Sequence, residues 1–310
     1  MAYTFKRVEE GCYKDLVFLY ESAFKQSTSL AYYQNKFNTN YLGVKHLGFL
    51  AYDEKNKPAA FYGVFPYMME YNGEKILGAQ SGDTMTHPDH KGKGLFTALG
   101  KMTNELAKRE GIKFMFGLPN KFSYHGLVKS LQWTHVDDMH NYRFSVFTLP
   151  LSAVAKKFSF LLPLYNRYVQ FVLRKRKAGA SFFKSSVITK EFGGVLRDDA
   201  FYNYKNFYNN HLIRIENRNA WIKIDGSLFI GDIEFNDDTD VNKLIGEIKK
   251  LACCLGCTDV LFPVTGDTNW DLILKPVAKQ EKGLALCLLN LQSELPMNKF
   301  KFTAADFDTF

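Results

Sequence analysis

The chain has 310 residues, of which 46% are hydrophobic and 23% charged, a composition typical of a soluble globular protein long enough for two domains. Its net charge is +8, but no basic stripe accompanies a nucleic-acid-binding motif, so we expect no nucleic-acid partner. The sequence has no apolar run of about 20 residues and no leader pattern, so we expect a cytoplasmic protein.

The first half predicts an α/β fold with a mixed sheet. Residues 5–8 predict a strand, and the apolar spacing that follows predicts a helix. From His46 the hydrophobic period changes to two, and Asn72-Gly73 is a strong hairpin signal. The further predicted elements are strands at 47–52, 59–71 and 75–86, a helix at 95–109, a strand at 113–118, a helix at 119–131 and two strands within 133–147.

A segment at 150–180 separates the two halves. It is rich in Leu, Phe, Tyr and Val and ends in the basic cluster Arg174-Lys175-Arg176-Lys177. We favour a connecting helix packed between two domains. The alternative is a helix lying on a membrane surface, so peripheral membrane contact through 151–177 stays open. The expected domains are 1–149, the connector 150–180, and 181–310.

The second half repeats the order of the first in outline. Its predicted elements are a hairpin around Asp225-Gly226, a helix at 241–255, a strand at 259–264, a helix at 271–274 and a strand at 284–290. Where the first half has glycines, this half has Asn236-Asp237-Asp238-Thr239-Asp240. These acidic and amide side chains would repel a pyrophosphate, so we interpret 181–310 as a degenerate second copy.

Three cysteines, Cys253, Cys254 and Cys257, are close enough in sequence to suggest a metal site. No second cysteine pair or His-x-His partner completes a ligand set. We therefore predict buried free thiols and no bound metal.

The loop His90-Lys91-Gly92-Lys93-Gly94, just before a predicted helix, is the main functional signal. Unpaired backbone N–H groups converge at a helix N-terminus, and glycine lets the backbone approach a phosphate. A P-loop would need a Gly-Lys-Ser/Thr ending, which is absent. A dinucleotide-binding fingerprint would need a parallel βαβ unit, whereas the preceding strand belongs to an antiparallel meander.

The stretch from Thr84 to Leu99 resembles the coenzyme A motif of GNAT acyltransferases, in which an Arg/Gln-x-x-Gly-x-Gly/Ala loop opens a helix. Lys91 stands where Arg or Gln is usual, and Gly94 matches. Phe96 replaces the last Gly or Ala, which we expect to narrow the space near the phosphates. The resemblance covers roughly residues 1–147 and implies a GNAT fold. The second half resembles the degenerate repeat of tandem members.

The resemblance implies acetyl-coenzyme A, or another acyl-coenzyme A, as co-substrate, without a metal. The strand residues Thr84, Met85 and Thr86 would pair with the pantetheine arm and polarise the thioester. Asn120 matches a pantetheine-binding Asn, although it could equally be a helix cap. The loop residues expected to hold the pyrophosphate are Lys91, Gly92, Lys93, Gly94, Leu95, Phe96 and Thr97.

Catalytic candidates follow from the same resemblance. Val128 occupies the position of the usual acid, a Tyr, so Tyr124 one turn earlier is the substitute. Asp83, near the end of the 75–86 strand, is the candidate base. In some tandem members the terminal carboxylate reaches the active site, which makes Phe310 a second candidate beside the alternative of a frayed terminus.

The leading function is N-acylation of a small-molecule amine such as an amino sugar. The alternatives are acetylation of a protein, an acyltransferase with a lipid-linked acceptor, and a non-catalytic acyl-coenzyme A-binding module. Five aromatic residues are candidate platforms on which a sugar ring could stack: Phe61, Tyr62, Phe65, Tyr67 and Tyr142.

Overall fold

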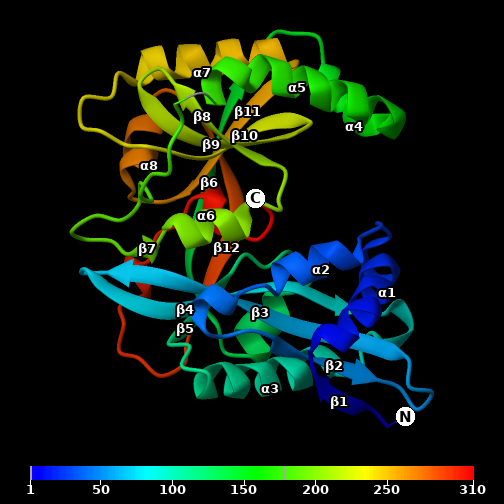
Figure 1. Ribbon diagram of the computed structural model, residues 1–310. Helices are drawn as coiled ribbons and strands as arrows, with labels where there is room; N and C mark the ends of the chain where they lie inside the picture. The colour runs from blue at the N-terminus through cyan, green and yellow to red at the C-terminus, as the bar shows by residue number, and fades with distance from the viewer. Residues whose placement is uncertain (1, 178) are drawn as a thin grey trace. The chain divides into compact units, whose positions relative to one another are not determined.

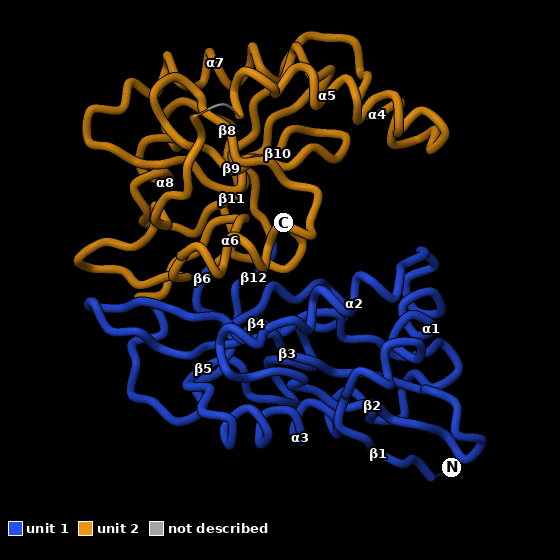
Figure 2. Tube along the Cα trace, viewed as in Figure 1, with its two compact units in different colours: residues 1–137, 284–298 blue, residues 138–283, 299–310 orange. Residues whose placement is uncertain are grey.

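The computed structural model describes residues 2–177 and 179–310. The chain forms two compact units (Figure 2). Unit 1 comprises residues 1–137 and 284–298, and unit 2 comprises residues 138–283 and 299–310. Unit 1 therefore contains a segment from near the C-terminal end of the chain, and this segment interrupts unit 2 in the sequence. The predicted mixed α/β fold is confirmed, because each unit combines helices with strands of both relative directions.

Unit 1 is a sheet with helices on both faces. Its strands are β1 (Thr4–Arg7), β2 (Leu47–Tyr52), β3 (Pro58–Tyr71), β4 (Glu74–Thr86), β5 (Phe114–Gly117) and the later part of β12 (Lys279–Asn290), in that order across the sheet. Strands β1 to β4 are antiparallel neighbours, whereas β4 and β5 are parallel. The helices α1 (Tyr13–Phe24) and α2 (Leu30–Lys36) lie on one face and α3 (Leu95–Arg109) on the other (Figure 1).

The period of two along β3 explains how this sheet is covered on both faces. Phe65 lies next to Phe37, which follows α2, with ring centroids 5.2 Å apart. Its neighbour Val64 points to the opposite face and joins the cluster that contains Leu95 and Leu99 of α3. Because successive strand residues face opposite ways, a continuous apolar run is required where both faces are buried.

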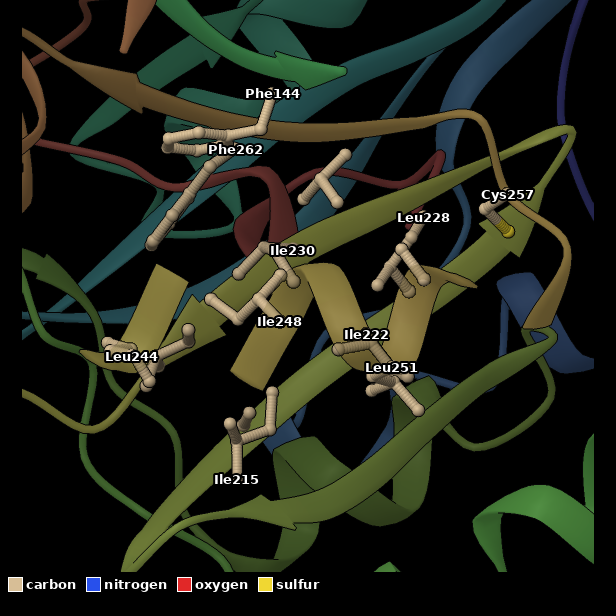
Figure 3. Close-up of a cluster of buried hydrophobic side chains, with 14 of the residues drawn as sticks. Phe144, Ile215, Ile222, Leu228, Ile230, Leu244, Ile248, Leu251, Cys257 and Phe262 are labelled. Atoms are coloured by element: carbon tan, nitrogen blue, oxygen red, sulfur yellow. The ribbon is translucent and has the colours of Figure 1, made fainter. Parts of the chain in front are cut away.

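Unit 2 has a comparable sheet. Its strands run in the order β12 (first part), β6 (Thr134–Ser145), β11 (Asp259–Thr265), β10 (Ser227–Ile233), β9 (Arg218–Asp225) and β8 (Asn210–Ile215). Its helices are α4 (Leu151–Lys157), α5 (Leu162–Lys177), α6 (Asp199–Lys205), α7 (Val241–Leu255) and α8 (Asn269–Leu274), and β7 (Gly194–Val195) is a short strand. Leu244, Ile248 and Leu251 of α7 face the strands in the core (Figure 3).

The two halves repeat one order of elements. In unit 1 the meander β2-β3-β4 is followed by α3 and by β5, which is parallel to β4. In unit 2 the meander β8-β9-β10 is followed by α7 and by β11, which is parallel to β10. The strand beside β5 is β12, from the end of the chain, and the strand beside β11 is β6, from its middle. The last strand of each half therefore pairs in the sheet of the other half: β12 beside β5, and β6 beside β11.

Two predictions about secondary structure were wrong. The residues 133–147 form one strand, β6, rather than two, because no glycine or proline provides a turn within it. The segment after Pro150 is two helices, α4 and α5, rather than one. Helix α4 ends at Lys157, because its C-cap residue Phe158 has φ and ψ of −113° and 88°, which are not helical. Pro163 lies in the first turn of α5, where proline is tolerated.

Candidate functional site

The loop between β4 and α3 contains two glycines in the left-handed region. The φ angles of Gly92 and Gly94 are 72° and 75°, and a Cβ atom at either position would meet no neighbouring atom within 4 Å. Gly94 is the N-cap of α3 and provides no side-chain hydrogen bond. The first backbone N–H groups of α3 therefore lack helical partners and point out of the helix end. This geometry fits a phosphate group.

In unit 2 the corresponding helix N-terminus, that of α7, is capped by a side chain. There Asp240 is the N-cap of α7, and its Oδ1 accepts a hydrogen bond of 3.1 Å from the backbone N–H of Lys243. A carboxylate at a helix N-terminus both satisfies the N–H groups and repels an anion. The N-terminus of α3 is therefore open to an anion, whereas the N-terminus of α7 is capped by a carboxylate.

Strand β4 contains a bulge at Asp83. Gly82 pairs with Gly63 and Met85 with Phe61, so two residues of β4 lie opposite one residue of β3. Asp83 adopts a φ of 49°, an uncommon value that an Asp tolerates better than most residues. The bulge breaks strict alternation along the end of β4.

The end of β4 is also where its parallel pairing with β5 stops. That pairing runs from Gly78 to Gln80, and in the described residues it does not extend to Ser81–Thr86. Backbone groups on this edge of β4 are therefore not paired with β5, and the pantetheine contact of Thr84, Met85 and Thr86 stays a prediction. The same strand leads through a turn at Pro88–His90 into the Gly92–Gly94 loop.

Asp83 is held by a buried lysine that the sequence did not indicate. Lys36 Nζ, on a side chain with no exposed surface, lies 2.7 Å from Asp83 Oδ2. It also donates to Tyr32 Oη at 3.0 Å and lies 4.4 Å from the centroid of the Phe65 ring. Tyr32 Oη in turn donates to Asp83 Oδ2 at 3.3 Å. No local pattern could have identified Lys36, because its partner is 47 positions away in the chain.

Met85 also contacts α2, since Tyr33 Oη lies 3.8 Å from Met85 Sδ. Burial, followed by the charge of Asp83, raises the pKa of Tyr33 well above its ordinary value. Tyr33 therefore remains a neutral hydroxyl at any pH at which the protein is assayed. Asp83 and Met85 thus approach the same helix despite the bulge.

Phe96 does not occupy the phosphate region, contrary to our expectation. Its ring packs edge-on against Tyr62, with centroids 5.4 Å apart, and belongs to the margin of the unit 1 core. A Cβ atom on Gly126 would lie 2.6 Å from the Phe96 ring, so the glycine makes room for it. The bulk of Phe96 is accommodated between α3 and the segment after β5, which leaves its backbone N–H at the start of α3.

Asn120 acts as a cap in this structure. Its Oδ1 accepts from the backbone N–H groups of Phe122 and Ser123, at 2.9 and 3.1 Å. The capping alternative thus has direct support. The pantetheine contact stays a prediction, and it would have to use the amide nitrogen of Asn120, because the oxygen is already engaged.

Tyr124 forms a pair with His135, another residue that sequence reasoning missed. Tyr124 Oη lies 3.1 Å from His135 Nδ1, and the two rings meet edge-on with centroids 5.7 Å apart. Val128 is partly buried at the margin of the core, which explains an apolar residue there. A hydroxyl bonded to an imidazole has a partner with which to exchange a proton.

Phe310 lies in unit 2 and is not frayed. Its ring is 3% exposed and meets Trp221 edge-on at 5.8 Å, and its backbone oxygen accepts from Asn210 Nδ2 at 3.3 Å. A Cβ atom on Gly231 would lie 2.2 Å from this ring, so that glycine is required for the packing. The terminus is ordered by its side chain, while a catalytic role for its carboxylate stays a prediction.

Other sequence expectations need correction. The five aromatic residues considered as sugar platforms are fully buried and serve the cores: Phe61, Tyr62, Phe65, Tyr67 and Tyr142. All five cysteines are free, but only Cys257 of the 253–257 group is buried, since Cys253 and Cys254 are exposed. In the described part of the chain no group of three His, Cys, Asp or Glu side chains is arranged to hold a metal ion.

A surface hollow of about 540 Å³ lies in unit 1 beside the starts of α1 and α2. It is lined by Glu10, Gly11, Tyr13, Lys14, Leu30 and Gln34. None of the loop or β4 residues described above borders it, so we do not assign it to the candidate site.

Comparison with known proteins supports the interpretation of the β4 edge and the Gly92–Gly94 loop as part of an acyltransferase domain. A family profile described as an acetyltransferase (GNAT) domain matches residues 4–135, from β1 to the start of β6. Residues 4–135 are a GNAT acetyltransferase domain. The profile agrees with the enzyme class predicted from the loop, an acyltransferase, and the GNAT family implies an acyl-coenzyme A donor and an amine acceptor. No curated protein matches the chain in sequence.

Solved structures show that the fold of the GNAT domain and of the second half recurs together. A probable N-acyltransferase from Enterococcus faecalis V583 aligns over 94% of this chain and 73% of its own, with 12% identity and a TM-score of 0.61. A GCN5-related N-acetyltransferase from Kribbella flavida aligns over 94% and 72%, with 11% identity and a TM-score of 0.57. Eis1 from Mycobacterium abscessus aligns over 98% and 83%, with 9% identity and a TM-score of 0.55. These likenesses concern the fold.

Proposed function

We propose that the GNAT domain transfers an acetyl or other acyl group from coenzyme A to the amine of a small molecule. The observation that carries this proposal is the continuity of β4. One strand contains the bulge with Asp83, the open edge at Ser81–Thr86 and the exit to the Gly92–Gly94 loop. The strand edge that would bind the donor and the carboxylate of Asp83 are thus provided by neighbouring residues of β4.

The donor would be held mainly by backbone groups. The N–H groups of Gly92 to Thr97, with Lys91 and Lys93 beside them, suit the pyrophosphate. The edge of β4 at Thr84, Met85 and Thr86 suits the pantetheine amides, and Asn120 suits a contact further along the arm. Acyl-coenzyme A supplies the activated thioester, and a backbone N–H on the β4 edge would stabilise the oxyanion.

Asp83 would receive the acceptor amine. Lys36 Nζ is ion-paired with its carboxylate, and a carboxylate can bind a protonated amine and act as a general base. Because Lys36 and Tyr32 also hydrogen-bond to Asp83, the carboxylate has a fixed orientation. This favours a compact amine over a long, flexible acceptor, since the carboxylate is only 13% exposed.

Tyr124 would protonate the departing thiolate. Its hydroxyl can pass a proton to the sulfur and regain one through His135, to which it is hydrogen-bonded. The terminal carboxylate of Phe310 stays a candidate base that the resemblance to tandem members implies, and the packing of its ring within unit 2 does not bear on that role.

The direct test is the release of free coenzyme A from acetyl-coenzyme A with a panel of acceptors. The panel contains amino sugars, other small amines, lysine peptides and peptides with a free N-terminus. We expect release with a small amine, and loss of about 100-fold in kcat/KM in Asp83→Asn with acetyl-coenzyme A affinity retained.

Release only with peptides would contradict the small-molecule acceptor. Tight acyl-coenzyme A binding with no release from any acceptor would instead indicate a non-catalytic binding module. Lys75→Gln, an exposed charge change at the distal end of β3-β4, is the control for nonspecific effects on turnover.

A further inference from the structure

One segment of unit 2 combines an excess of basic residues with exposed apolar side chains. Three of its cations form ion pairs with acidic residues outside the segment: Arg143 with Asp259 and Glu281, Lys156 with Asp225, and Arg176 with Glu247. Residues 139–190 contain ten Lys and Arg residues and not one Asp or Glu, whereas the whole chain has a net charge of +8. This 52-residue stretch thus accounts for more than the entire positive excess. It includes α4, α5 and the loops beside them.

The apolar side chains of this region are unusually exposed. Among the described residues, six large hydrophobic side chains are at least 70% exposed, and five of these lie between 147 and 171. They are Phe147, Leu149, Phe160, Leu164 and Phe171. All five lie within 25 residues of sequence. Monomeric soluble proteins rarely expose large apolar patches unless the surface binds something.

Helix α5 carries two apolar stripes. Val169 and Leu173 face inward and belong to the core of unit 2, and Tyr165 Oη donates to the backbone oxygen of Leu255 at the end of α7. Figure 1 shows α4 and α5 following one another beside α7. These inward-facing residues hold α5 against the core of unit 2.

The second stripe of α5 faces outward. Leu164 and Phe171 are spaced i and i+7 and are 70% and 75% exposed, so they share one face, whereas the hydroxyl of Tyr168 between them donates to the backbone oxygen of Cys254 on α7. Arg167 and Arg174, both exposed, fall along the side of this stripe, and Lys175 extends it. An outward apolar stripe bordered by cations is the pattern of a helix that lies in a lipid headgroup region. We call the surface formed by 147–175 the basic apolar surface.

We propose that the basic apolar surface binds an anionic phospholipid bilayer. No helix in the described chain is long and apolar enough to span a membrane, so contact would be peripheral. A second copy of the same surface would be repelled by its like charge. The sequence has no nucleic-acid-binding motif, and single-stranded nucleic acid is tested below as an alternative because three of the five exposed side chains are Phe rings.

This inference does not depend on acyl transfer, and its test does not use activity. The segment should not be deleted, because Val169 and Leu173 are core residues. The informative variant is Phe160→Ser/Phe171→Ser, which changes two side chains that are 77% and 75% exposed. Leu272→Ser, at 59% exposure on α8 of the same unit, is the matched control.

The experiment is cosedimentation with vesicles of phosphatidylcholine alone or mixed with phosphatidylglycerol. We expect binding to the anionic vesicles, a loss of about tenfold or more in partitioning for Phe160→Ser/Phe171→Ser, and none for Leu272→Ser. Removing charge with Arg167→Gln/Arg174→Gln/Lys175→Gln should lower anionic binding by about fivefold per residue. The control for charge is Lys55→Gln/Lys57→Gln/Lys75→Gln in unit 1.

Absence of binding to anionic vesicles at low salt would overturn the proposal, as would equal binding by Phe160→Ser/Phe171→Ser. Concentration-dependent dimers that this variant abolishes, without vesicle binding, would assign the surface to a second copy. Binding of a single-stranded oligonucleotide in place of vesicles would assign it to nucleic acid. Equal loss in both control variants would show that the effect is not local to the basic apolar surface.

Discussion

Lys36 Nζ lies 2.7 Å from Asp83 Oδ2, and the lysine side chain is fully buried. The two residues belong to α2 and to the bulge of β4, so their contact ties a helix to the strand that is proposed to bind the donor. A buried charge is tolerated only with a partner, and each residue here is the partner of the other. This pair links the stability of the GNAT domain to the geometry of its proposed site.

The first prediction concerns this pair. Lys36→Met and Asp83→Asn should each lower the free energy of unfolding by about 3 kcal/mol, because each leaves a buried charge without its counter-charge. The double variant should lose clearly less than the sum of the two. Urea unfolding of the four proteins measures the coupling. Additive losses would show that the pair does not interact energetically.

The second prediction concerns the loop. Gly94→Glu should weaken acyl-coenzyme A binding at least about tenfold, because a carboxylate at the N-terminus of α3 repels the pyrophosphate. Gly43→Glu is a close control, since Gly43 has a φ of 73° and equally open surroundings. Both variants should lose about 1 kcal/mol of stability from left-handed strain. Isothermal titration that finds equal affinity in both variants would refute the assignment of the loop.

The third prediction concerns the proposed acid. Tyr124→Phe keeps the ring against His135 but removes the hydroxyl, so kcat should fall about 100-fold while acetyl-coenzyme A affinity changes little. His135→Gln should produce a smaller loss, because it removes only the partner of the hydroxyl. Steady-state kinetics with direct titration of the donor separates these effects. An unchanged kcat in Tyr124→Phe would assign the proton to another group.

A fourth prediction concerns pH. Burial, followed by the charge of Lys177, lowers the pKa of His211 to about 4 from its ordinary 6.5. Below pH 6.5 His211 binds a proton in the unfolded chain but not in the folded chain. The stability that comes from keeping His211 neutral is therefore complete above pH 6.5 and is lost as the pH falls toward 4. The slope is at most about 1.4 kcal/mol per pH unit, and the total at most about 3 kcal/mol.

His211→Gln should remove this dependence. Urea unfolding between pH 4 and 7 should therefore give a flatter profile for the variant than for the natural chain. His125→Gln, at an exposed position of unit 1, is the control. Parallel profiles for the natural chain and His211→Gln would contradict the predicted shift.

The fifth prediction separates two roles of Phe310. Phe310→Ala should cost about 3 kcal/mol, because its ring is buried against Trp221 and Gly231. A short glycine extension after Phe310 keeps the ring but moves the terminal carboxylate. If that carboxylate is the base, the extension lowers turnover while the unfolding midpoint stays the same. Unchanged turnover would leave Phe310 with a structural role alone.

The sequence by itself determined the features that depend on neighbouring residues. The hairpin at Asn72-Gly73, the helix at 95–109 and the glycine-rich loop before it were predicted at their observed places, because turn chemistry and hydrophobic period act within a few residues. The contrast between Gly94 and Asp240 was visible in the same way. Local chemistry indicated an anion-binding loop, and the resemblance of residues 84–99 to a known coenzyme A motif pointed to the GNAT family.

Only the tertiary structure decided which distant residues meet. The pairs Lys36 with Asp83 and Tyr124 with His135, and the inward packing of Phe96, depend on how elements are packed and not on local spacing. The pairing of β12 with β5 and of β6 with β11 also depends on packing, since either strand could complete either of the two similar sheets. Hydrogen bonding and burial choose between such alternatives, and both act across the fold rather than along the chain.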